Sequence, residues 1–183
     1  MSHTLARRPL KLSWAIALGL AATAAIQTTA FALSAALLVF TAIGAVVFGK
    51  LSTRIGTRRV LAIGWALLAV SAVGGVLVTS LAEVLVVVVV AGVGNGAATA
   101  VTWPLLTALI PPEKTGVYAG LKAAAESVAI PLSVVVASEL FLPRFGYRGI
   151  FAMLALNIIL ALVLLVRFVH VPRAAEPVLA LNL

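Results

Sequence analysis

Long, unbroken apolar runs dominate the pattern of hydrophobic and polar positions in this chain. The first extends from Leu12 to Phe48, and shorter examples are Leu85–Ala91 and Ile158–Val166. Membrane β-strands alternate apolar and polar residues over about ten positions, and these runs do not alternate. A membrane-spanning chain without such strands forms the hydrogen bonds of its backbone N–H and C=O groups within α-helices. The pattern therefore predicts an all-α membrane protein.

Polar breaks divide the apolar sequence into six predicted transmembrane helices. The run from Leu12 to Phe48 is nearly twice as long as a bilayer of about 30 Å requires. We therefore predict two helices there, with a turn at the polar cluster Gln27-Thr28-Thr29. Pro111–Lys114 and Pro143–Arg148 are read as loops. The six predicted helices cover about residues 10–27, 30–50, 59–79, 82–110, 116–142 and 149–170.

Composition supports a membrane protein and excludes several other classes. Hydrophobic residues make up 63% of the chain and charged residues 10%, against roughly 45–50% and about 25% in soluble domains. A soluble α/β protein would need polar helix faces that this sequence lacks. Without cysteine there is no disulfide, zinc or thiol chemistry. The two histidines, His3 and His170, lie near the ends of the chain, so we expect no enzyme, no metal site and no cofactor.

The positive charges predict how the helices are oriented. A basic loop over residues 49–59 carries several of the 13 Lys and Arg residues. Lys and Arg concentrate in the cytoplasmic loops of membrane proteins. With six helices, the loops and tails on the side of this loop contain Arg7, Arg8, Lys11, Lys50, Arg54, Arg58, Arg59, Lys114, Arg167 and Arg173. The opposite side has only Arg144 and Arg148, so the basic side is predicted to be cytoplasmic.

The domain organisation follows from this orientation. We predict a basic cytoplasmic tail over residues 1–11, a six-helix transmembrane domain over 12–170 and a cytoplasmic tail over 171–183. A five-helix alternative, with residues 12–48 as one span, would place Arg7, Arg8 and Lys11 outside. The predicted location is the inner (cytoplasmic) membrane. The net charge of +8 lies in loops and tails and forms no basic face for nucleic acid.

The predicted fifth helix contains two ionisable residues at membrane depth. Lys122 and Glu126 are four residues apart and so lie on one helix face. Charged groups at that depth usually face a cavity or a partner. One interpretation is that Glu126 binds substrate or a coupling proton while Lys122 tunes its pKa, and the other is a structural ion pair. In the fourth helix, Asn95 and Trp103 are further candidates for lining a cavity.

The fourth predicted helix also contains the small-residue sequence AGVGNGAATA. A phosphate-binding glycine loop would need a strand before it and a helix after it, whereas this sequence lies inside an apolar span. Gly92, Gly96 and Ala100 are spaced four residues apart, and small residues at this spacing allow helix backbones to approach closely. We therefore predict a helix-packing role for these three residues.

The basic loop carries a recognisable motif. Its sequence GKLSTRIGTRRV resembles the signature of the major facilitator superfamily, written roughly G-x-L-a-D-r-x-G-r-[kr]-[kr]. Thr53 stands where the family has an acidic residue. The resemblance implies that the loop takes part in conformational switching. The matching residues are Gly49, Leu51, Arg54, Gly56, Arg58 and Arg59.

The resemblance also implies an architecture. Members of this family have twelve helices in two six-helix halves, and each half consists of two inverted three-helix repeats. This chain resembles one half. The loss of the acid at Thr53 and the absence of arginine in 86–90 are more similar to the C-terminal half. Residues 145–151 are similar to the beginning of the family's last helix.

The function implied by the resemblance is secondary active transport. A half-size transporter would pair with a second six-helix half, most simply in a homodimer, and move a small solute by alternating access. Its expected partners are the lipid bilayer, the second half and a small-molecule substrate, and a proton is the candidate coupling ion. The alternative is a non-transporting membrane module, or a fragment of a longer twelve-helix transporter.

Overall fold

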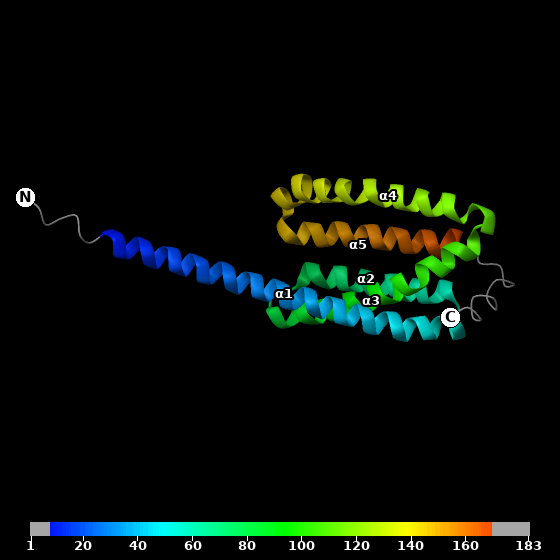
Figure 1. The fold of residues 1–183 in the computed structure, drawn as a ribbon, viewed down its shortest axis with the longest axis horizontal. Coiled ribbons are helices and arrows are strands. Elements are labelled where there is room, and N and C mark those ends of the chain that lie inside the picture. The colour runs from blue at the N-terminus through cyan, green and yellow to red at the C-terminus, as the bar shows by residue number, and fades with distance from the viewer. Residues whose placement is uncertain (1–7, 170–183) are drawn as a thin grey trace, which may run out of the picture. The chain divides into compact units, whose positions relative to one another are not determined.

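The computed structural model describes residues 8–169, with side chains from residue 18 onward. Within these residues every element is a helix, short non-helical connections join the helices, and there is no strand, as predicted. The two predicted tails lie largely outside the described residues, as do Arg7, Arg173, His3 and His170. The elements, in chain order, are α1 (Arg8–Ile55), α2 (Thr57–Leu77), α3 (Leu81–Leu109), η1 (Pro112–Lys114), α4 (Thr115–Val136), η2 (Ala137–Phe141) and α5 (Leu142–Phe168) (Figure 1).

The turn predicted at Gln27-Thr28-Thr29 is wrong for this structure. Helix α1 is continuous over 48 residues, which corresponds to about 72 Å. No glycine or proline interrupts it at this point. The hydroxyl groups of Thr28 and Thr29 donate to the carbonyl of Ala25, at 2.9 and 3.0 Å. These polar side chains are therefore satisfied within the helix and do not end it.

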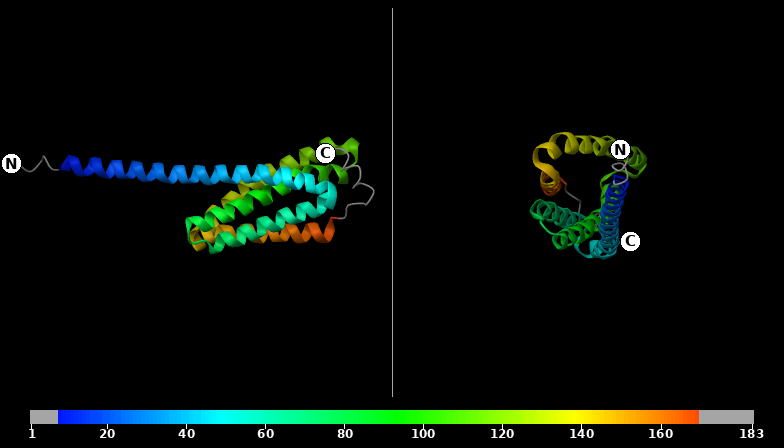
Figure 2. Two further views of the ribbon diagram at one scale, coloured as in Figure 1. Left: turned by 90° about the horizontal axis from the view of Figure 1, so that it is seen from below. Right: turned by 90° about the vertical axis from the view of Figure 1, so that its left-hand side faces the viewer.

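The chain divides into two compact units, residues 1–36 and residues 37–183. Described by itself, the first unit is helical from Arg8 onward. The second unit holds the remainder of α1 and all the other elements. Within it, α2 packs against both α3 and α5, and Figure 2 shows these three helices running alongside one another.

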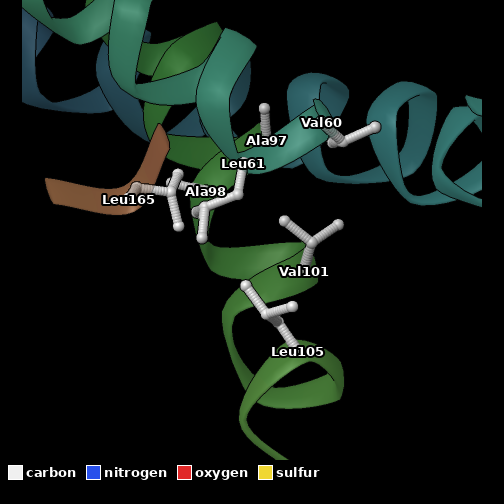
Figure 3. Close-up of a cluster of buried hydrophobic side chains, with 7 residues drawn as sticks. All are labelled: Val60, Leu61, Ala97, Ala98, Val101, Leu105 and Leu165. Atoms are coloured by element: carbon white, nitrogen blue, oxygen red, sulfur yellow. The ribbon is translucent and has the colours of Figure 1, made fainter. Parts of the chain in front are cut away.

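The core of the second unit lies where α2 crosses α3 (Figure 3). Small residues bring the two helices together: a Cβ on Gly64 would lie 2.9 Å from the backbone nitrogen of Ala98. Leu165 of α5 joins the same cluster. The buried side chains of this core are Val60, Leu61, Ala97, Ala98, Val101, Leu105 and Leu165.

Glycines of α3 also lie against the later part of α1. A Cβ on Gly92 would lie 2.8 Å from the Cβ of Phe40 and 2.9 Å from the carbonyl oxygen of Leu37. A Cβ on Gly96 would collide with the carbonyl oxygen of Thr41. Ala100, the third residue of the predicted packing series, is half-buried.

The reversal between α4 and α5 is sharper than the loop predicted for residues 143–148. Helical structure continues through the π-helical segment η2 to Phe145. Gly146 then breaks the helix with φ 62°, a conformation that costs other residues more than it costs glycine. As a result, α4 and α5 run in opposite directions (Figure 1).

Four helical stretches in the described residues are long and apolar enough to cross a membrane. They are Leu18–Ile55, Thr57–Leu77, Leu81–Leu109 and Pro112–Phe168. The last of these contains η1, α4, η2 and α5, and so includes the reversal at Gly146.

Candidate functional site: the basic loop and the ion pair of α4

The basic loop is a tight connection made by one glycine. Helix α1 ends at Ile55 and α2 begins at Thr57, so the segment predicted as a loop over residues 49–59 is helical except at one residue, and the name basic loop is kept for this segment. Gly56, between them, has φ 89° and ψ 142°, which strongly favours glycine. The sequence pattern indicates Gly56 as a motif residue of the loop, and the structure has the turn at this residue.

Arg58 connects this loop to the far end of the chain. Its Nη2 atom donates to the backbone carbonyl oxygen of Val166 in the last turn of α5, at 2.6 Å. Carbonyls at the C-terminal end of a helix have no intrahelical partner, and a cation there also interacts favourably with the helix dipole. Arg58 therefore caps α5. The sequence identifies Arg58 as a motif residue but does not identify this partner.

The other motif residues are arranged around the same turn. Arg54 and Arg59 are exposed, as is the neighbouring Lys50, whereas Gly49 and Leu51 are half-buried. Leu51 packs against the hydrophobic core. The hydroxyl of Thr53, at the position of the family's acid, donates to the carbonyl of Lys50 at 2.8 Å. This hydroxyl carries no charge, so it does not replace a carboxylate as a partner for the arginines.

Lys122 and Glu126 form an ion pair on α4. The Lys122 Nζ atom lies 2.6 Å from Glu126 Oε1, and the two side chains are 36% and 56% exposed. Helix α4 buries none of its residues. The pair therefore lies on an open helix face.

The other residues predicted to line a cavity, Asn95 and Trp103, lie on α3 and, within the described part of the chain, form no hydrogen bond with the ion pair of α4. The Asn95 side-chain nitrogen is 3.5 Å from Thr41 Oγ1 of α1, which is a long hydrogen bond. Trp103 is 47% exposed and precedes Pro104 inside the helix. Among the hydrogen bonds of the described residues, none joins Asn95 or Trp103 to Lys122 or Glu126.

Comparison with known protein families identifies the family of this chain. The chain matches the family model of the Major Facilitator Superfamily over residues 9–181. The chain belongs to this superfamily. Comparisons with curated proteins and with solved structures found no match.

Membership confirms the resemblance that the basic loop suggested. The major facilitator chain is a multi-pass membrane protein of a transporter family, and 183 residues are consistent with half the size of a twelve-helix transporter. The described residues contain no group of three or more His, Cys, Asp or Glu side chains that could hold a metal ion.

One polar feature of this major facilitator chain was missed at the sequence level. Ser80 and Glu83 form a capping box at the start of α3: Ser80 Oγ accepts from the Glu83 backbone, while Glu83 Oε2 accepts from the Ser80 backbone. Glu83 Oε2 also accepts from the backbone nitrogen of Thr79 at 2.7 Å. The Ser-x-x-Glu spacing before an apolar run was the available signal.

Proposed function

We propose that this chain is a half-size secondary active transporter, and not an enzyme, which moves a small solute across the cytoplasmic membrane. Two six-helix halves would surround a solute site near the bilayer midplane and rock against each other in alternating access. A homodimer is the simplest source of the second half. Glu126 would bind the substrate or a coupling proton, with Lys122 beside it.

The observation that carries this proposal is the exposed ion pair of α4. Lys122 and Glu126 lie inside an apolar helix that buries none of its own residues. Charged side chains at membrane depth almost always face the bundle interior or a water-filled cavity, because lipid does not solvate them. A second half that covered this face would provide that environment, with Asn95 and Trp103 as further candidates for its lining.

The proposed topology has six spans and places both termini in the cytoplasm. The 48 residues of α1 are about twice as many as one span of a bilayer of about 30 Å requires, so this segment would have to reverse direction once in the membrane to supply the first two spans. Residues from Leu37 onward pack against α3 and would form the second span, which assigns the residues before Leu37 to the first. Two spans from α1 would place Arg7, Arg8 and Lys11 on the same side as the basic loop, as the positive-inside rule requires.

The ion-pair face can be tested directly, because the chain contains no cysteine. Ala129 lies one turn from Glu126 on the same face of α4, whereas Ala124 lies on the opposite face. We expect Ala129→Cys to react with a charged, membrane-impermeant thiol reagent in proteoliposomes, and Ala124→Cys to remain protected. Equal protection of both cysteines would contradict a hydrated site on this face.

A second candidate function is a membrane module that does not transport. The observation that favours it is Thr53, which stands where the family has an acidic residue. Its uncharged hydroxyl donates to the Lys50 carbonyl of the same helix, so the conformational switch would lack its carboxylate. A module of this kind would remain monomeric and would leave Ala129→Cys facing lipid and unreactive.

A further inference from the structure

An apolar cavity lies among α2, α3 and α5, separate from the ion pair on α4. Its volume is about 210 Å³. Phe151 of α5 and Gly75 of α2 lie side by side in its wall, and a Cβ on Gly75 would lie 2.7 Å from the Phe151 Cε1 atom. An apolar cavity of about 150 Å³ is enough to hold a benzene-sized group and excludes water. The cavity is therefore large enough for an apolar ligand group.

The walls of this cavity are suited to hydrocarbon and not to a polar solute. Ser71 provides the only hydroxyl among its lining side chains, and that hydroxyl already donates to the Leu68 carbonyl at 2.8 Å. A polar group placed in the cavity would lose its hydrogen bonds to water and find no partner. The principal walls are Ala72, Val84, Val87, Val88 and Leu154.

A second, more open hollow adjoins the first and contains a carboxylate. The two hollows share Val78 and Val87, and the second also includes Thr79 and Glu83. The hydrogen bonds that Glu83 accepts within the capping box all go to Oε2. Within the described part of the chain Oε1 has no donor, so it is available to a ligand. This carboxylate lies at the opposite end of α2 from the basic loop.

We propose that these two hollows together bind one bilayer lipid whose headgroup ends in an ammonium group. An acyl chain would occupy the apolar cavity, and the ammonium would donate to Glu83 Oε1. The occupant follows from charge complementarity: a cationic group beside an apolar chain matches a carboxylate beside an apolar cavity. Given the orientation proposed above, the lipid belongs to the leaflet facing away from the cytoplasm. The binding itself does not depend on transport.

The test is native mass spectrometry of the full chain, with phosphatidylethanolamine and phosphatidylglycerol of identical acyl chains as competing probes. We expect the ethanolamine lipid to be retained over the glycerol lipid by roughly twofold to fivefold, the range for one exposed ion pair. Glu83→Gln should abolish this preference and still fold, because glutamine can also complete the capping box. Glu113→Gln is the matched control, since Glu113 is an exposed carboxylate in η1, and it should keep the preference.

A cavity variant tests the other half of the proposal. Ala91 is a half-buried wall residue, and Ala91→Leu should reduce retention of both lipids without removing the preference between them. Equal retention of the two lipids by the unmodified protein would overturn headgroup recognition at Glu83. Unchanged retention in Ala91→Leu, with the unfolding temperature preserved, would overturn acyl-chain binding in the cavity.

Discussion

Arg58 and Val166 are 108 positions apart in the chain, yet the Arg58 guanidinium donates to the Val166 carbonyl at 2.6 Å. The contact joins the basic loop, which carries the family motif, to the last turn of the last described helix. A motif defined by short-range spacing therefore has a long-range structural partner. Arginine suits this role because its charge is permanent and its several N–H groups can reach a helix end.

Loss of the Arg58 contact should destabilise the protein. A hydrogen bond from a charged donor contributes about 1.5–3 kcal/mol, and the helix-end position adds a smaller favourable term. We expect Arg58→Ala to lower the free energy of unfolding by about 1.5–3 kcal/mol, measured by thermal unfolding in detergent. Arg59→Ala is the matched control, because Arg59 is exposed on the adjacent position. If the two variants unfold alike, the Arg58 contact contributes nothing specific.

Gly96 provides a test of the packing between α1 and α3. Even an alanine methyl group would collide with the carbonyl oxygen of Thr41, and a backbone carbonyl cannot move aside as a flexible side chain can. We expect Gly96→Ala to cost about 1–3 kcal/mol of stability, read out as a lower unfolding temperature.

A second glycine controls for the intrinsic effect of the substitution. Gly120 lies inside α4, and a methyl group added there would have no neighbouring atom within 4 Å. Gly120→Ala should leave stability unchanged or raise it by about 0.5–1 kcal/mol, because alanine favours helices. Equal unfolding temperatures for both variants would contradict a packing role for Gly96.

Structural features that depend on residues close in the sequence could be predicted from it. Contacts between residues far apart in the sequence could not. The helical class follows from the apolar runs, and the break between α1 and α2 falls at Gly56, a glycine of the predicted basic loop, because glycine has the backbone freedom that this conformation needs. The turn predicted at Gln27–Thr29 failed because threonine hydroxyls can bond back to Ala25 within the helix. The Lys122–Glu126 contact followed from i, i+4 spacing. By contrast, the Val166 partner of Arg58 depends on how α5 packs, which no local pattern encodes.

The proposed homodimer predicts a definite mass. Native mass spectrometry of the protein in nanodiscs should show twice the 18.8 kDa of one chain, because a single copy leaves the charged face of α4 uncovered. A variant in which Lys122 and Glu126 are both replaced by leucine would no longer require a polar partner and should dissociate more readily. A stable monomer of the unmodified chain would contradict the homodimer. The second six-helix half would then have to be a different protein.

The six-span topology predicts the location of the N-terminus. A single cysteine at Ser2 should be inaccessible to an impermeant thiol reagent in intact cells and should react after the membrane is opened. A cysteine at Glu113, next to the predicted cytoplasmic Lys114, is the matched internal control. Labelling of the Ser2 cysteine in intact cells would favour the five-span topology, in which α1 crosses the membrane once.

Glu126 should be needed for transport and not for folding. An exposed ion pair at i, i+4 contributes only about 0.3–0.5 kcal/mol to stability, so Glu126→Gln should unfold at nearly the same temperature as the unmodified protein.

The effect of Glu126→Gln should instead appear in a transport assay, with proteoliposomes that enclose a pH-sensitive dye and are presented with a panel of sugars, amino acids and organic cations. If Glu126 carries the coupling proton, solute-evoked acidification of the lumen should be lost in Glu126→Gln. It should persist in Glu139→Gln, because Glu139 lies in η2, near the reversal at Gly146 and far from the middle of the helix. Acidification that survives in Glu126→Gln would leave the Lys122–Glu126 pair as a structural element of α4.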